Sequence, residues 1–386
     1  ASYSSRLLWC PPSPRQAAPP MAAVAVAAAA DAPCAADRGE RPLTALPLFD
    51  SGFALYGFAD GRLVGADTAS GAVRLKDQEL PFLERVFDPA KRELGEVPRF
   101  DAASRDPASA AEAFAAAHLD AFVPAVIPGL ARDWPAMGRW DLDYFALSCG
   151  DIDVQVTSPE GKKRSQALGD YLAEVRTPSA ASSAAPRGQQ PEAAEAQRRP
   201  YLRGWYYERD CPWLAAELWK PGDFHDLAFK DWFKRLPKQH HPDFHWLFLG
   251  GAGATTPLHV DPTGTHAWLT QLSGRKRFVL FAPCDLPALL RGEGDVGKGP
   301  FLPLEGAVAR KIPHLEAVLE PGDTLFVPAF WAHHVQCLDE SVSLTWNFLG
   351  ERFFSVVRAA FLAHKVGTVA AVAAPAAAAD STEGAQ

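Results

Sequence analysis

Two short histidine-containing runs carry the residue types of a metal centre. His259-Val260-Asp261 places an imidazole and a carboxylate two positions apart, and His333-His334 follows about 70 residues later. In a β-strand, residues i and i+2 project to the same face, so His259 and Asp261 converge on one point. Two histidines and one carboxylate form the facial triad of non-haem iron, which leaves positions open for a chelating cosubstrate and O2. Only one of two adjacent histidines can point inward, and alternation alone does not decide which.

The elements that must position these residues lie between 243 and 350. Gly, Pro, Ser and Asp turn signals separate a succession of short apolar runs there. Many short strands without alternating helices predict an all-β sandwich or barrel. The predicted strands are 245–249, 267–272, 277–281, 324–328, 333–337 and 341–348.

The preceding part of the chain has mixed patterns. Residues 43–75 predict short strands, and 109–119 a helix. A strand is expected at 122–127, a helical segment at 133–147 and another strand at 153–157.

Composition narrows the class of protein. The chain has 386 residues, a net charge of -8 and 48% hydrophobic residues, which allows a sizeable core. An acidic chain without a basic stripe argues against a nucleic-acid surface. The six cysteines form no CxxC pair and predict small core residues in a reducing compartment. No strongly apolar stretch reaches the roughly 18 residues of a membrane span.

Three biased segments divide the chain. Residues 1–40 are rich in Ala and Pro, which predicts disorder or a targeting leader. Residues 177–199 predict a flexible insertion, because strand-like sequence resumes at Tyr201. Residues 365–386 predict a disordered Ala-rich tail. These segments leave an N-terminal extension at 41–100 and one catalytic domain at 101–364.

Three linked motifs then resemble the Jumonji C family of Fe(II)- and 2-oxoglutarate-dependent oxygenases, and are most similar to its lysyl hydroxylases. The motifs are TPLHVDPTGTHAW at 256–268 with SGRKRFVLFAP at 273–283, LEPGDTLFVPAFWAHHV at 319–335, and SLTWN at 343–347. The resemblance covers roughly 120–350. It implies a mainly β fold, a double-stranded β-helix (cupin-like jelly roll) with flanking helices.

The resemblance also implies a role for each matching residue. His259, Asp261 and His333 would bind the iron, since His333 is the histidine that follows the aromatic pair. Lys276 would pair with the distal carboxylate of 2-oxoglutarate, and a buried dianion does require a cation there. Further cosubstrate contacts are expected from Thr256, Thr345, Tyr201 and Asn347.

Some positions depart from the family pattern. Ala332 replaces a second Trp and predicts extra space beside the metal, and Leu269 replaces an Asn near the cosubstrate. His266 is expected at the substrate mouth. The histidines of the loop at 240–241 are expected to be solvated.

The implied reaction is decarboxylation of 2-oxoglutarate to succinate coupled to C–H hydroxylation of a protein substrate. The alternatives are an N-methyl demethylase of histones or other proteins with the same chemistry, a catalytically silent cupin and a zinc isomerase. No histone-reader or zinc-binding module is visible, which favours a hydroxylase. A helix at 352–364 is a candidate homodimer contact, and the expected location is cytoplasmic or nuclear.

Overall fold

The computed structural model describes residues 46–49, 53–59, 62–67, 71–73, 86, 88–158, 161–176, 199–235, 244–261, 265–295 and 299–351. The predicted leader at 1–40, nearly all of the insertion, the 352–364 helix, the tail and the 240–241 histidines lie outside these residues.

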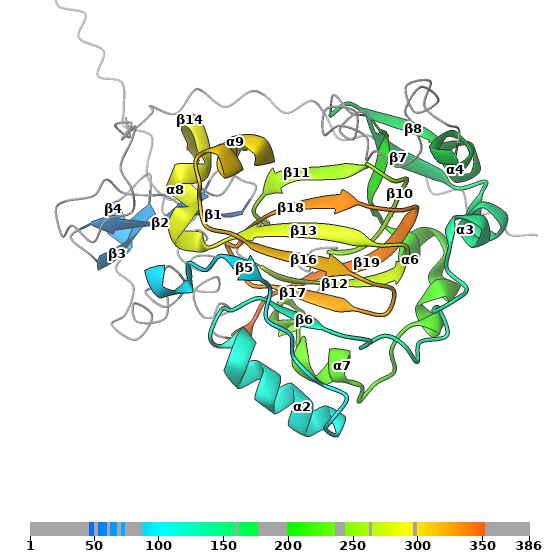
Figure 1. The fold of residues 1–386 in the computed structure, drawn as a ribbon, viewed down its shortest axis with the longest axis horizontal. Coiled ribbons are helices and arrows are strands. Elements are labelled where there is room, and N and C mark those ends of the chain that lie inside the picture. The colour runs from blue at the N-terminus through cyan, green and yellow to red at the C-terminus, as the bar shows by residue number, and fades with distance from the viewer. Residues whose placement is uncertain are drawn as a thin grey trace, which may run out of the picture.

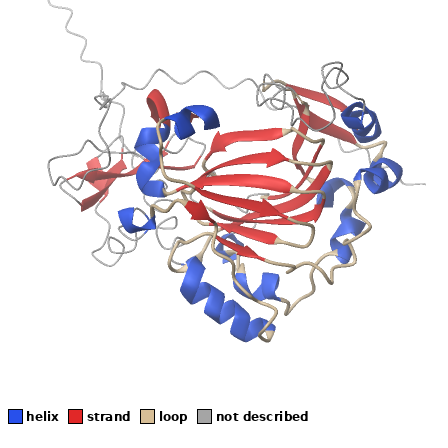
Figure 2. Cartoon of the chain, viewed as in Figure 1, coloured by secondary structure: helices blue, strands red, loops and turns tan. Residues whose placement is uncertain are grey.

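Two facing sheets form the body of the fold (Figures 1 and 2). One has the order β6-β17-β12-β19-β10-β9-β7-β8, and the other β11-β18-β13-β16-β5. The first comprises β6 (Ala125–Ile127), β17 (Thr324–Val327), β12 (His266–Ser273), β19 (Ser341–Phe348), β10 (His245–Gly250), β9 (Tyr201–Trp205), β7 (Asp153–Thr157) and β8 (Lys163–Ala167). The second comprises β11 (Thr255–His259), β18 (Ala332–Cys337), β13 (Lys276–Phe281), β16 (Leu315–Leu319) and β5 (Gly95–Glu96). The mainly β, cupin-like jelly roll is confirmed.

Side-chain alternation builds the interior between these sheets. Alternate positions of β12, β13, β16, β17 and β18 meet in one buried apolar cluster, here called the interior cluster. Both sheets contribute to it, so the barrel is a packed core. Its members include Ala267, Leu269, Phe278, Leu280, Leu325, Val327, Trp331 and Val335.

The remaining positions face outward and are covered by the flanking helices. One sheet packs its outer face against five helices in one buried cluster. Its side chains in that cluster include Trp268 of β12, Phe326 of β17 and Phe348 of β19. The helices are α2 (Pro107–Phe114), α3 (Leu142–Cys149), α4 (Leu168–Arg176), α6 (Tyr207–Asp210) and α7 (Phe224–Ala228). On the other sheet, Val279 and Phe281 pack against α8 (Leu286–Leu289) and α9 (Leu304–Ala309). The remaining strands are β1 (Leu46–Phe49), β2 (Phe53–Ala59), β3 (Arg62–Asp67), β4 (Gly71–Val73), β14 (Leu290–Asp295) and β15 (Gly299–Phe301).

The six strands predicted between 243 and 350 are confirmed, with ends shifted by one residue at most. The strand predicted at 122–127 begins only at Ala125, because Phe122 has a positive φ of 56° that no strand accommodates. The helical segment predicted at 133–147 begins at Leu142, where Asp141 accepts a hydrogen bond from the Tyr144 amide at 2.7 Å.

The N-terminal extension contributes to the barrel. β5 pairs in parallel with β16, and the following Val97 is buried in the interior cluster. The last residues before 101 are therefore part of the jelly roll. Within the described residues, no helix is long and apolar enough to cross a membrane.

Candidate metal and cosubstrate site

Antiparallel pairing of β11 with β18 brings the two histidine motifs together. His259 lies opposite His333 in the register, and their ring centroids are 4.2 Å apart. Asp261 follows two residues after the end of β11, with 3.9 Å between its Oδ1 and the His259 Nε2. One ligand atom from each of the three residues lies within 4.8 Å of the other two. A single ion could therefore touch all three.

Backbone carbonyls hold both imidazoles in the tautomer that a metal requires. The Nδ1–H of His259 donates to the Pro257 carbonyl at 2.8 Å, and that of His333 donates to the Trp331 carbonyl at 3.0 Å. Each Nε2 is left with its lone pair free, as in metal sites whose ligands are oriented by outer hydrogen bonds. Burial lowers the pKa of His259 to about 3, which favours the neutral, metal-binding form.

The carboxylate of the cluster is also oriented by neighbours. Burial raises the pKa of Asp261, while a hydrogen bond from Asn347 opposes that shift. The Asn347 amide also donates to the Thr265 hydroxyl at 3.0 Å. Asn347 thus lies beside the three clustered side chains, and its described contacts are with Asp261 and Thr265.

The structure separates the two adjacent histidines. His333 points into the barrel with Asp261, and His334 projects from the opposite face of β18, where it lines a surface cleft. Alternation along the strand makes these directions exclusive.

Lys276 is a fully buried cation in the barrel interior. Its side chain is 0% exposed, and its Nζ donates to the Ser343 hydroxyl. The rings of Tyr201 and Phe248 each lie with centroids 5.5 Å from the Nζ. No carboxylate among the described residues pairs with it, and burial lowers its pKa to about 8. A buried ammonium without a counter-anion is costly unless an anion binds beside it.

Two hydroxyls of the same interior are buried without a hydrogen bond to any residue that the structure describes. The Tyr201 hydroxyl and the Thr345 Oγ1 are buried with no partner among the described residues. Tyr201 lies over the Lys276 ammonium, and Thr345 is two residues from Ser343 on the same face of β19. Buried polar atoms are rarely left unpaired in folded proteins, so this region is complementary to a ligand with several acceptor oxygens. Thr256 lies opposite Val335 of the interior cluster.

The sequence matches the Cupin-like domain family over residues 110–352. The chain belongs to this family. Its relatives include the lysine-specific demethylase JMJ21 of Arabidopsis thaliana, at 28% identity over 62% of this chain and 24% of that protein. The 2-oxoglutarate and iron-dependent oxygenase JMJD4 of Homo sapiens is 27% identical over 57% of this chain and 53% of its own length. The bifunctional arginine demethylase and lysyl-hydroxylase psr-1 of Caenorhabditis elegans is 24% identical over 58% of this chain and 55% of its own length.

These matches confirm that the chain belongs to the cupin-like and Jumonji C domain family, among whose members above is a 2-oxoglutarate and iron-dependent oxygenase. The chain spans between a quarter and just over half the length of these three relatives.

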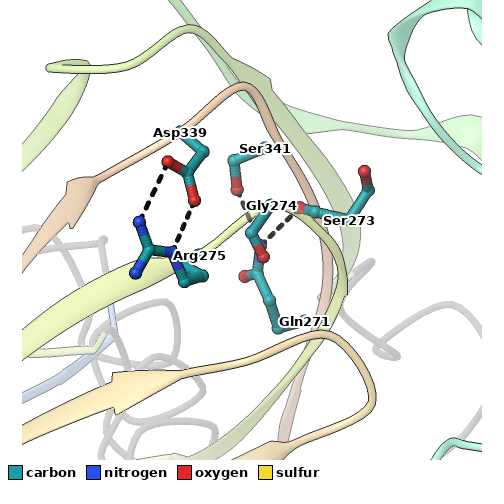
Figure 3. A network of polar contacts seen from close by, with 6 residues as sticks. All are labelled: Gln271, Ser273, Gly274, Arg275, Asp339 and Ser341. Atoms are coloured by element: carbon teal, nitrogen blue, oxygen red, sulfur yellow. Dashed lines mark hydrogen bonds and ion pairs between the residues drawn. The ribbon is translucent and has the colours of Figure 1, made fainter.

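Within this cupin-like barrel, two hairpin ends fix the backbone next to Lys276 (Figure 3). The Gln271 amide donates to the Ser273 carbonyl at 2.7 Å, the Gly274 carbonyl at 3.0 Å and the Ser341 hydroxyl at 2.8 Å. Arg275 pairs with Asp339 across the same end at 2.7 Å. The turn between β12 and β13 is thereby tied to the turn between β18 and β19.

Two minor expectations about the site are wrong. His266 does not line a substrate mouth, because it is buried on the outer face of β12, where its Nδ1 accepts from the Ala329 amide at 3.1 Å. Ala332 packs with the α8–α9 side of the sheet, so it adds no space beside His333. Both errors have the same cause, since neighbouring positions of a strand face opposite ways. Leu269 does point inward, into the interior cluster.

Two residues of the site were missed from the sequence. Ser343 contacts the Lys276 ammonium, and alternation from Thr345 could have identified it. Arg203 lies near enough to His259 for its charge to lower the imidazole pKa. No motif marks Arg203, because its position depends on the pairing of β9 with β10.

Proposed function

We propose that this protein is an Fe(II)- and 2-oxoglutarate-dependent protein hydroxylase. His259 and His333 would hold the iron through Nε2, and Asp261 through its carboxylate. With 2-oxoglutarate and O2, the bound iron supplies the oxidative decarboxylation that is coupled to hydroxylation of a substrate C–H bond.

One observation carries the cosubstrate assignment. The barrel buries the Lys276 ammonium without a carboxylate partner among the described residues, together with the unpaired hydroxyls of Tyr201 and Thr345. Cys337, opposite Lys276 in the register, is four residues from His333, or about 13 Å along β18. The side chain of Lys276 and a short diacid, placed end to end, can span this distance. One ligand could therefore contact both the ammonium and the metal.

The chain's own groups then have distinct tasks. Lys276 neutralises the far carboxylate, and the hydroxyls of Tyr201, Thr345 and Thr256 would hydrogen-bond it. Asn347 orients Asp261. Apolar side chains of the interior cluster keep water from the space between, which strengthens each of these electrostatic contacts.

A demethylase is the second candidate, because the names of two of the relatives above include demethylase activity. Hydroxylation of an N-methyl group releases formaldehyde, whereas hydroxylation of a carbon side chain leaves an added oxygen on the protein. The two functions therefore differ in product.

The test uses purified protein with Fe(II), 2-oxoglutarate and O2, with and without a cell extract as a source of substrate proteins. We expect succinate release that the extract stimulates, and a substrate that gains one oxygen. Asp261→Ala is the control, since it removes one of only three ligands and should abolish stoichiometric iron binding. Succinate release no greater than that of Asp261→Ala would refute the proposal and favour the silent-cupin or zinc-cupin alternatives. Formaldehyde in place of the added oxygen would identify the demethylase.

A further inference from the structure

A surface cleft opens along the edge strand β11, whose last residue is His259. It is lined by Thr255, Pro257 and Leu258 of β11 and by His334 of β18. Parts of β7, β9, β14 and the segment 301–304 complete it. In Figure 1, β14 and α9 lie next to the β11 edge, and β7 lies near its other end. Pro257, whose carbonyl accepts the Nδ1–H of His259, lines the cleft, so the cleft lies beside the proposed metal site.

Three arginines line this cleft, which are Arg199, Arg203 and Arg291. Arg199 donates to the Val175 carbonyl at 3.4 Å and has no carboxylate partner among the described residues. No described carboxylate pairs with Arg203 or Arg291 either. Arg203 is also partly buried, and this burial lowers its pKa. Leaving such a guanidinium unpaired is unfavourable unless a ligand supplies the anion.

Elsewhere in the described chain, arginines are commonly paired. Ion pairs join Arg92 with Asp285, Arg139 with Glu217, Arg164 with Glu174, Arg176 with Asp143, Arg209 with Asp210, Arg275 with Asp339, and Arg277 with Glu316. The cleft is thus a local excess of positive charge on a chain whose net charge is -8. None of the described residues that line the cleft is acidic. Burial lowers the pKa of His334, and the exposed Glu305 of α9 opposes that shift.

The overall negative charge would favour a basic partner, whereas the cleft favours an acidic one. Local charge decides which group docks, because at physiological salt the field of distant surface charges is screened beyond about 8 Å. Arginine is also suited to carboxylates, since its planar fork bonds both oxygens.

We propose that Arg199, Arg203 and Arg291 bind an acidic side chain of the protein substrate, next to the residue that is hydroxylated. This inference rests on the proposed hydroxylase function and adds a substrate class to it, namely acidic protein segments. Arg203 would be the main specificity determinant, because it lines the cleft from within β9 and is partly buried there, whereas Arg291 is exposed.

The test measures peptide binding directly. Fluorescein-labelled decapeptides of alternating Glu and Ala, Gln and Ala, or Lys and Ala are titrated with the full chain and followed by anisotropy. We expect the Glu peptide to bind more tightly than both others. Arg203→Gln combined with Arg291→Gln should weaken its binding at least about tenfold, since two charge-assisted contacts are lost. Arg105→Gln combined with Arg132→Gln removes the same charge from exposed positions outside the cleft and should leave binding nearly unchanged.

Several outcomes would overturn the inference. Equal weakening by both double variants would show a general charge effect, and preference for the Lys peptide would reverse the substrate class. Displacement of the Glu peptide by millimolar inorganic phosphate would reduce the cleft to a site for free anions. If the cleft variant instead raised the half-saturation for 2-oxoglutarate by the same factor, its arginines would serve the cosubstrate. Anisotropy needs no turnover, so absence of succinate would count against the proposed function alone.

Discussion

At the residue scale, this site depends on groups whose direction is set by hydrogen bonds and whose charge is altered by burial. The imidazoles of His259 and His333 are oriented by backbone carbonyls two residues earlier in the chain. Lys276 has one hydroxyl contact and no described counter-ion. Both features lead to predictions that single substitutions can test.

The first concerns the adjacent histidines. His333→Ala should lose stoichiometric iron binding and succinate release, because it removes an inward-facing ligand. His334→Ala should remain folded and iron-loaded, since its side chain lies on the outer face of β18. Metal content by atomic absorption, with circular dichroism to verify folding, distinguishes the variants. An exchange of these two phenotypes would contradict the register of β11 and β18.

The second concerns the charge of Lys276, whose pKa is lowered to about 8 by burial. The free protein already carries the ammonium below pH 8, so 2-oxoglutarate binding should be constant there. Above pH 8, binding must take up a proton, and affinity should fall by up to about tenfold per pH unit. Calorimetric titration of Mn(II)-loaded protein at pH 7, 8 and 9 measures this change.

Two variants serve as controls for that titration. Lys276→Arg stays charged, so its weaker binding should not change over this pH range. Lys276→Ala should weaken binding about 30-fold to several thousand-fold, as expected for a charge-assisted bond removed from a buried anion. An unchanged affinity in Lys276→Ala would remove 2-oxoglutarate from the proposed function.

At the element scale, the tied hairpin ends determine where Lys276 lies. Gly274 sits in the turn before β13 with φ of 66°, and a Cβ there would lie 1.9 Å from the Glu340 carbonyl oxygen. That contact is with backbone of the other hairpin, so a side chain at 274 must push the two turns apart.

A non-glycine residue with a positive φ lowers the free energy of unfolding by about 1–2 kcal/mol. Gly274→Ala should lower it by more than that, because of the added contact with the other hairpin. Gly138→Ala is the matched control, because Gly138 also has a positive φ of 72° and a Cβ at that position would have no heavy atom within 4 Å. We expect a larger fall in melting temperature for Gly274→Ala, together with weaker 2-oxoglutarate binding. Equal falls for the two variants would show that the hairpin contact does not matter.

At the scale of the whole molecule, the jelly roll from β5 to β19 holds its own core. The sequence of residues 1–40 and 366–386 lacks the apolar periodicity needed to pack on it. We predict that deleting both segments leaves melting temperature and succinate release nearly unchanged.

Differential scanning calorimetry checks this prediction. A fall of more than about 5 °C, which exceeds 1 kcal/mol in a domain of this size, would show that a deleted segment stabilises the barrel. Val97→Ala provides the contrast, because it opens a cavity in the interior cluster. It should lower the free energy of unfolding by about 1–3 kcal/mol.

The sequence by itself determined the strand-rich architecture, the spacing of His259 and Asp261, and the order of the motifs that place Lys276. These are local properties, since alternation and turn residues act over a few positions. Only the tertiary structure decided which residues meet across strands. The register of β11 with β18 placed His333 opposite His259, with His334 on the outer face beside Ala332. The pairing of β12 with β17 and β19 placed His266 on an outer face. Arg203 came beside His259 through pairing between segments distant in sequence, a contact that no local pattern encodes.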